Sequence, residues 1–366
     1  MNQKLTFISQ REKFNAVRVR EEQREQRRQQ MTCLRALLFS LSYVVLGSGR
    51  PLLITSAKFA TSHVPRGYHP ENPERVAAVL QHLQKSPTGK YEIKEPSAET
   101  STERQRLALE AIESVHDMEY IKEVKFRSHG GARQLSPWDS DTYLSRDTFE
   151  TCLLAQSAWL DGIDHVLGGA EFAFAITRPP GHHAERTTGM GFCLFNFAAA
   201  AAVYALNIKK AQKVAILDID VHFGNGVSDI ASAFPNIRYA SLHQAGIFPI
   251  PPATDGVQPT PHQNILTVNL NSGFRGEAFL EALRTRALPF LQEFGADILI
   301  VCAGFDALSS DELAEGALRP QDYAAVSELL KASSFKRILF GLEGGYNLDE
   351  LPLAVEASIE PFVASV

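Results

Sequence analysis

The chain has 366 residues, of which 45% are apolar and 21% are charged, and its formal net charge is −6. These fractions are ordinary for a folded globular protein and exclude a disordered, collagen-like or multi-span membrane chain. The four cysteines form no CxxC pair, so the sequence indicates neither a disulfide framework nor a cysteine zinc site.

The first fifty residues differ from the rest in charge. They hold ten Lys or Arg against four Glu, which leaves residues 51–366 with a net charge of −12. A basic stretch followed by the apolar run Leu34–Leu46 is typical of a targeting segment, and this run is shorter than the roughly 20 residues that cross a bilayer. We predict an N-terminal extension over residues 1–50 and one folded domain over residues 51–366. The acidic domain argues against direct nucleic-acid binding and suits a cationic substrate.

Apolar runs of strand length and helical segments follow along the folded domain. The expected strands are Leu52–Thr55, Phe172–Ile176, Val214–Leu217, Ile237–Ala240, Ile265–Leu270, Ile298–Cys302 and Ile338–Leu342. The expected helices are Asp147–Val166, Phe195–Leu206, Glu277–Phe294 and Gln321–Leu330, and the proline-rich stretch Pro249–Pro261 is expected to be a loop. Continuously apolar strands are typical of a parallel sheet that is covered on both faces. We therefore predict a single α/β domain, with a mainly parallel multi-stranded sheet and helices on both faces.

Polar residues follow the run Val214–Leu217 at alternate positions, as Asp218, Asp220 and His222. Alternate side chains of an extended strand share a face, so these three are expected to point the same way. Burying two carboxylates with an imidazole costs several kcal/mol unless a cation neutralises them. The pattern favours zinc, iron or manganese, although a buried Asp–His hydrogen bond with a purely structural role would have the same sequence.

Three further strand ends carry polar residues. Asp306 follows the run Ile298–Cys302, and together with Asp220 and His222 it would complete the three protein ligands of a catalytic zinc. His182 and His183 lie in a Pro-Gly loop and could be metal ligands, a proton-handling pair or part of a surface loop.

The last of these strands is followed by Tyr346. Its phenol could donate a hydrogen bond to a developing oxyanion, or it could be a buried structural tyrosine.

Taken together, these segments resemble the zinc-dependent histone deacetylase family, which has the arginase–deacetylase fold. The resemblance runs from about Leu52 to Glu360. Its motifs, in chain order, are HPENPER at 69–75, RPPGHHA at 178–184, GMGFCLFN at 189–196, DIDVHFGNG at 218–226, SLH at 241–243, AGFDA at 303–307 and EGGYN at 343–347. Asn225, where class I members usually carry Asp, makes the chain more like class II and bacterial members.

The resemblance implies hydrolysis of an acetyl-lysine-type amide to a free amine and acetate. It implies one Zn²⁺ per chain, held by Asp220, His222 and Asp306. The resemblance also implies that His183 is the general base and acid, that His182 forms a dyad with it and is tuned by Asp218, and that Asn225 orients His183. Tyr346 would polarise the substrate carbonyl.

The resemblance also implies a structural K⁺ behind the zinc site. Its ligands would be the side chains of Asp218, Asp220 and Ser241 and the carbonyls of His222 and Leu242. A second cation site is implied at the carbonyls of Ala231, Phe234 and Ile237.

A substrate tunnel is implied as well. Phe192 and Phe248 would form its walls, with Gly191 leaving room between them, and Asp141 would grip the substrate backbone at the rim. Arg75 would lie near the released acetate. The loop Phe248–Gly256 departs from the family pattern, which leaves the rim shape and substrate choice open.

Three alternatives remain at this point. The first is acetylpolyamine hydrolysis: Leu313 stands where polyamine-selective relatives place an acidic gatekeeper, although Glu312 is adjacent. The second, an arginase-like ureohydrolase, would need more carboxylates than AGFDA offers. The third, a non-catalytic acyl-lysine binding protein, would show lost catalytic positions.

The expected partner is therefore an acetylated lysine in a protein or peptide, or a small acetylated amine. The resemblance suits the cytoplasm or nucleus, and the N-terminal extension leaves an organelle open.

Overall fold

The computed structural model describes residues 50–363, except for residues 88, 133, 137–138 and 251–252. The predicted N-terminal extension, apart from Arg50, and the apolar run Leu34–Leu46 lie outside the described residues.

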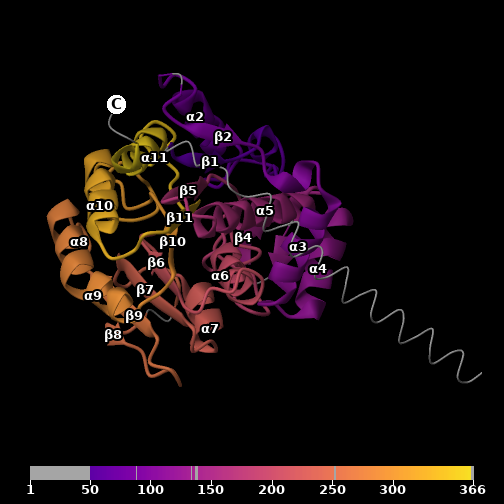
Figure 1. Ribbon diagram of the computed structural model, residues 1–366. Helices are drawn as coiled ribbons and strands as arrows, with labels where there is room; N and C mark the ends of the chain where they lie inside the picture. The colour runs from indigo at the N-terminus through magenta and orange to yellow at the C-terminus, as the bar shows by residue number, and fades with distance from the viewer. Residues whose placement is uncertain (1–49, 88, 133, 137–138, 251–252, 364–366) are drawn as a thin grey trace, which may run out of the picture. The chain divides into compact units, whose positions relative to one another are not determined.

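A nine-stranded sheet forms the centre of the described chain, in the order β2-β1-β5-β11-β10-β6-β7-β9-β8 (Figure 1). Every neighbouring pair is parallel except β8 with β9. The strands are β1 (Leu52–Ile54), β2 (Glu92–Lys94), β5 (Phe172–Ala175), β6 (Val214–Asp218), β7 (Ile237–Gln244), β8 (Gly256–Val257), β9 (Ile265–Leu270), β10 (Ile298–Ala303) and β11 (Ile338–Leu342). A separate antiparallel pair joins β3 (Gln134–Ser136) and β4 (Asp139–Tyr143).

Helices lie on both sides of this sheet. One group contains α3 (Thr102–Glu113), α4 (Met118–His129), α5 (Thr148–Leu167) and α6 (Phe197–Asn207), and the other contains α8 (Gly276–Ala282), α9 (Leu288–Glu293), α10 (Pro320–Ala332) and α11 (Leu351–Ile359) (Figure 1). The remaining α-helices of the described chain are α2 (Glu74–Leu83) and α7 (Asn225–Ser232). Short 3-10 turns occupy Ala57–Ala60, Ser97–Glu99 and Glu360–Phe362. Among the described residues, no helix is both long enough and apolar enough to cross a membrane.

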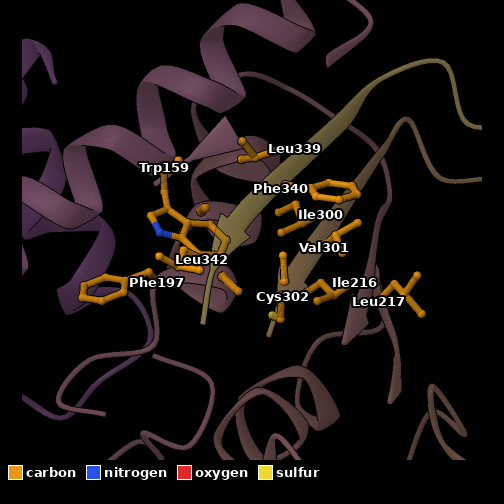
Figure 2. Packing of buried hydrophobic residues seen from close by; sticks show 14 of the residues in the cluster. Trp159, Phe197, Ile216, Leu217, Ile300, Val301, Cys302, Leu339, Phe340 and Leu342 are labelled. Atoms are coloured by element: carbon orange, nitrogen blue, oxygen red, sulfur yellow. The ribbon is translucent and has the colours of Figure 1, made fainter. Parts of the chain in front are cut away.

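The core lies on both faces of the sheet, against α5 and α6 on one side and against residues of α8 to α11 on the other. Figure 2 shows Trp159 of α5 beside Leu339 and Leu342 of β11. Gly341 makes this approach possible, because a Cβ there would lie 1.9 Å from Trp159 Cζ2. The sheet is therefore packed closely at the strands that carry the polar residues of interest.

The predicted α/β fold is confirmed, and each of the seven predicted strands and four predicted helices has a counterpart. The expected helix Glu277–Phe294 is interrupted by a π-helical turn at Leu283–Ala287. The prediction that Asp218, Asp220 and His222 alternate along one strand is wrong, because β6 ends at Asp218 and the chain turns after it.

Candidate functional site

Polar residues from four neighbouring strands meet at one edge of the sheet. The strands β5, β11, β10 and β6 are consecutive in the sheet and run parallel, so their carboxyl ends share an edge. Ligands of open α/β sheets bind outside this edge. The loops that follow these strands contain all of the residues proposed for the dyad, the metal and the phenol.

The three predicted metal ligands lie together. His222 Nδ1 is 3.1 Å from Asp306 Oδ2 and 3.2 Å from Asp220 Oδ1. Ligand atoms of a tetrahedral zinc, bound at roughly 2.0–2.2 Å, are about 3.3 Å apart. The two carboxylates are buried and the imidazole is nearly so, and the three residues form one of two groups in the described chain with metal-ligand geometry.

Two glycines allow the ligand carboxylates to reach this position. A Cβ at Gly304 would lie 2.1 Å from Asp220 Oδ2, and one at Gly344 would lie 2.2 Å from Asp306 Oδ2. The Gly344 N–H donates to Asp220 Oδ2 at 2.9 Å, and the Val221 N–H donates to Asp306 Oδ1 at 2.9 Å. The backbone thus fixes the orientation of both carboxylates.

The charge of this cluster also fits a cation. Burial and the negative charge of Asp220 raise the pKa of Asp306 to about 7. Burial lowers the pKa of His222, but its hydrogen bonds to Asp220 and Asp306 outweigh this and raise the pKa to about 10. The two buried carboxylates therefore hold a proton on the imidazole, and a divalent cation would take the place of that positive charge.

Asp218 has a different environment from the metal ligands. Its Oδ2 accepts hydrogen bonds from Tyr239 Oη at 2.8 Å and His182 Nδ1 at 3.1 Å. It is paired in register with Ser241 of β7, which places these two predicted potassium ligands on adjacent strands. Leu242, whose carbonyl is the other predicted ligand from β7, follows in the same strand.

The two histidines of the RPPGHHA motif lie beside the metal ligands. The ring centroids of His182 and His183 are 3.9 Å apart, and His182 Nε2 is 3.7 Å from Asp220 Oδ1. Burial lowers the pKa of His182, but the charges of Asp220 and Asp218 raise it overall, to about 10. Burial and the positive charges of His182 and His222 hold the pKa of His183 well below its usual value. His183 is thus the neutral member of the pair and His182 the charged one.

The loop that carries this pair is anchored by two buried carboxylates whose roles we did not predict. Glu343 Oε2 accepts the N–H groups of Gly181 at 2.6 Å and His182 at 3.1 Å. Glu71 binds Arg178, at the start of the loop, through two bonds of 2.7 and 2.8 Å. The positions of Glu71 and Glu343 inside recognised motifs were the only signal in the sequence.

Tyr346 is positioned by Arg75 and Asp311. The guanidinium carbon of Arg75 lies 4.7 Å from the centroid of the Tyr346 ring, and the guanidinium donates to the carbonyls of Gly345 at 2.7 Å and Glu343 at 2.5 Å. Asp311 Oδ2 accepts the Tyr346 N–H at 2.7 Å. Burial raises the pKa of the Tyr346 phenol well above its usual value, so the phenol remains a hydrogen-bond donor.

The residues predicted to wall a tunnel lie beside His183 and Tyr346. Phe192 packs edge-on against Tyr346 at 5.7 Å between ring centroids, and Phe248 packs edge-on against His183 at 4.8 Å. A Cβ at Gly191 would lie 2.6 Å from His183 Cδ2 and 2.8 Å from Phe248 Cε1. The predicted need for a glycine between the two aromatic walls therefore has a steric basis.

Side chains of strand β4 bind the backbone of Gly191 and Phe192. Asp139 Oδ2 accepts the Gly191 N–H at 3.2 Å, and Thr142 Oγ1 accepts the Phe192 N–H at 3.1 Å. Asp141, the proposed rim residue, is exposed on the same strand, and its carbonyl lies 2.9 Å from His69 Nε2. Leu313 is half-buried, and its N–H donates to Asp311 at 3.1 Å.

The three carbonyls of the implied second cation site do converge, but on a side chain. Asn264 Nδ2 donates to the carbonyl oxygens of Ala231, Phe234 and Ile237 at 2.8, 3.1 and 2.9 Å. An amide nitrogen therefore occupies the point at which a second cation was expected.

A mainly parallel α/β sheet with this arrangement at its carboxyl edge is the architecture of the arginase–deacetylase fold. The histone deacetylase domain matches residues 69–361, and the chain belongs to the histone deacetylase family. The site therefore lies in a deacetylase-family hydrolase.

Two curated proteins and one solved structure show the extent of the similarity. An uncharacterized protein of Synechocystis is 40% identical over 85% of this chain and 99% of its own length. The polyamine deacetylase HDAC10 of Mus musculus is 32% identical over 78% of this chain, which covers 43% of that protein. The crystal structure of the HDA15 HD domain superposes with a TM-score of 0.75 and 28% identity, covering 86% of this chain and 91% of that one.

Proposed function

We propose that this protein is a zinc-dependent deacetylase that hydrolyses acetyl-lysine-type amides to a free amine and acetate. The observation that carries the proposal is the approach of His222 Nδ1 to both Asp220 and Asp306 at 3.1–3.2 Å, beside the His182–His183 pair. Residues 51–366 would form the catalytic domain, and a structural K⁺ would lie at Asp218 and Ser241. Zinc held by the three ligands would supply Lewis acidity toward the amide carbonyl and would acidify a water molecule.

The chain's own residues would handle the protons. His183, whose pKa is held low, would take the proton of the attacking water on Nε2 and then give it to the departing amine. His182, held charged by Asp218 and Asp220, would stabilise the negative charge that develops on the substrate. Tyr346 would donate a hydrogen bond to the oxygen of the former carbonyl.

Acetylpolyamine hydrolysis is the second candidate. It is favoured by the similarity to the mouse polyamine deacetylase and by the exposure of Glu312 beside Leu313. A carboxylate at the tunnel mouth would attract a cationic amine, whereas Leu313 would not.

The test measures metal content and turnover on one sample of the full chain. We expect about one zinc per chain and faster hydrolysis of an acetyl-lysine peptide than of acetylspermidine. Asp306→Asn should lose both zinc and activity, and Asp349→Asn, at an exposed aspartate, is the matched control. A stoichiometric zinc protein that hydrolyses neither substrate would contradict the proposal, and a strong polyamine preference would favour the second candidate.

A further inference from the structure

The side-chain amide of Asn225 lies against one ring nitrogen of His183. Asn225 is the first residue of α7, and its Oδ1 is 2.7 Å from His183 Nδ1. The oxygen and the NH₂ group of an amide are nearly the same size, so a flipped side chain would fill the same space. The contacts of the amide nitrogen therefore decide whether His183 faces an acceptor or a donor.

Three hydrogen-bond acceptors lie within 3.4 Å of the Asn225 amide nitrogen. They are Glu185 Oε1 at 2.8 Å, the carbonyl oxygen of His183 at 3.4 Å and Met190 Sδ at 3.4 Å. Glu185 makes the shortest of these contacts and is the only charged group among them. In a flipped side chain, Asn225 Oδ1 would face this carboxylate with no proton between the two oxygens. Glu185 therefore fixes the orientation of the amide.

This orientation determines the tautomer of His183. Because Asn225 Oδ1 can only accept, His183 Nδ1 must carry the hydrogen, and in the neutral ring Nε2 keeps its lone pair. A general base needs that lone pair. A flipped amide would donate to Nδ1 and leave the proton on Nε2, where the ring could no longer accept one.

We propose that Glu185 is a positioning residue, which selects the base-competent tautomer of His183 through Asn225. Its position is defined, because the Glu185 N–H donates to the carbonyl of Thr188 at 2.9 Å. The predicted effect on rate rests on the proposed deacetylase function, whereas the tautomer is measured without substrate.

The first test is Glu185→Gln, which keeps the size of the side chain but offers Asn225 either a donor or an acceptor. A hydrogen bond to a charged group corresponds to a factor of about 10–100, and kcat on an acetyl-lysine peptide should fall by about that factor. KM should not change, because the residues around the substrate are untouched. The matched control is Glu123→Gln, which removes an exposed carboxylate paired with Arg127 and should keep full activity.

The second test separates positioning from general structural support. Asn225→Asp replaces the amide by a carboxylate, which accepts from His183 Nδ1 in either orientation. In that background Glu185→Gln should cause no loss of kcat relative to Asn225→Asp alone, and it removes the contact between two carboxylates that Asn225→Asp creates. An equal loss of kcat in both backgrounds would show that Glu185 has only a structural role, and would overturn the proposal.

The third test is the ¹⁵N spectrum of histidine-labelled protein, with the His183 signals assigned by their loss in His183→Ala. We expect the Nδ1-protonated form in the wild type and a mixture of tautomers in Glu185→Gln. An Nε2-protonated wild type, or a Glu185→Gln spectrum identical to the wild type, would refute the inference. The expected spectra in a protein without deacetylase activity would support the inference and count against the proposed function alone.

Discussion

Replacing Glu71 by glutamine is expected to destabilise the fold by about 3–5 kcal/mol. Glu71 and Arg178 are both fully buried, and the carboxylate accepts two hydrogen bonds from the guanidinium. Glutamine has a similar size but no charge, so the variant leaves the positive charge of Arg178 uncompensated in the interior. Removing one partner of a buried ion pair has this cost, whereas the net stabilisation from the intact pair is much smaller.

The pKa of Glu71 gives a second value for the free energy by which this carboxylate stabilises the fold. Burial raises the pKa of Glu71, but the charge and hydrogen bonds of Arg178 outweigh this and lower the pKa from 4.5 to about 2. Because the folded pKa lies below the unfolded one, the stabilisation is fully present above pH 4.5 and is lost as the pH falls toward 2. At 1.36 kcal/mol per pH unit, the shift corresponds to about 3 kcal/mol.

The assay is urea unfolding of the wild type and Glu71→Gln between about pH 6 and 3.5. The difference in unfolding free energy should be largest at the upper pH and should shrink below pH 4.5, because Glu71 of the unfolded chain takes up a proton there while Glu71 of the folded protein stays ionised. The control is Glu103→Gln, which breaks an exposed pair with Arg106 and should cost less than about 1 kcal/mol. A destabilisation by Glu71→Gln that is as small as this control, or one that does not depend on pH, would refute the reasoning.

Three further predictions concern single side chains. Tyr346→Phe removes only the hydrogen bond to the developing oxyanion, so we expect kcat to fall by about 10²–10³ while the zinc content, measured by metal analysis, stays that of the wild type. Wild-type turnover would contradict the proposed role of the phenol. Asn264→Leu should lower the unfolding free energy by about 1–3 kcal/mol in thermal or urea unfolding, since three buried carbonyls lose a donor; an unchanged midpoint would contradict this. Asp139→Ala removes the acceptor of the Gly191, Asp141 and Thr142 N–H groups, and we expect the KM for an acetyl-lysine peptide to rise by about tenfold with the metal content unchanged. An unchanged KM would show that the rim does not depend on these contacts.

The strands and the main site residues were predictable because their signals are local. A parallel strand covered on both faces is a run of apolar residues, and β10 is six such residues followed directly by Gly304, with Asp306 two positions further on. Charged residues directly after such a run must lie near the carboxyl edge of the sheet, independently of how the other segments fold. Local patterns do not show where a strand ends. The alternation predicted for Asp218, Asp220 and His222 was wrong because β6 ends at Asp218.

The contacts that hold the site could not be predicted in this way. Glu71 and Arg178 are 107 residues apart in the chain, and Glu343 lies 162 residues from Gly181. A carboxylate that binds a backbone N–H puts no requirement on the identity of the partner residue, so the pairing has no sequence pattern of its own. The same holds for Asn264, whose partners are three carbonyls.

These long-range contacts explain how four separate loops can hold one rigid site. Three of the loops present buried carboxylates to backbone N–H groups of a neighbouring loop: Asp220 to Gly344, Asp306 to Val221, Asp311 to Tyr346, and Glu343 to Gly181 and His182 in the loop after β5. Displacing any one loop would break hydrogen bonds made by its neighbours, so the loops are expected to move together or not at all. A catalytic constellation that must keep its groups within about 0.5 Å of the productive geometry needs this kind of mutual support. Asp220 and Asp306, two of the proposed zinc ligands, are thus also two of the carboxylates that connect one loop to another.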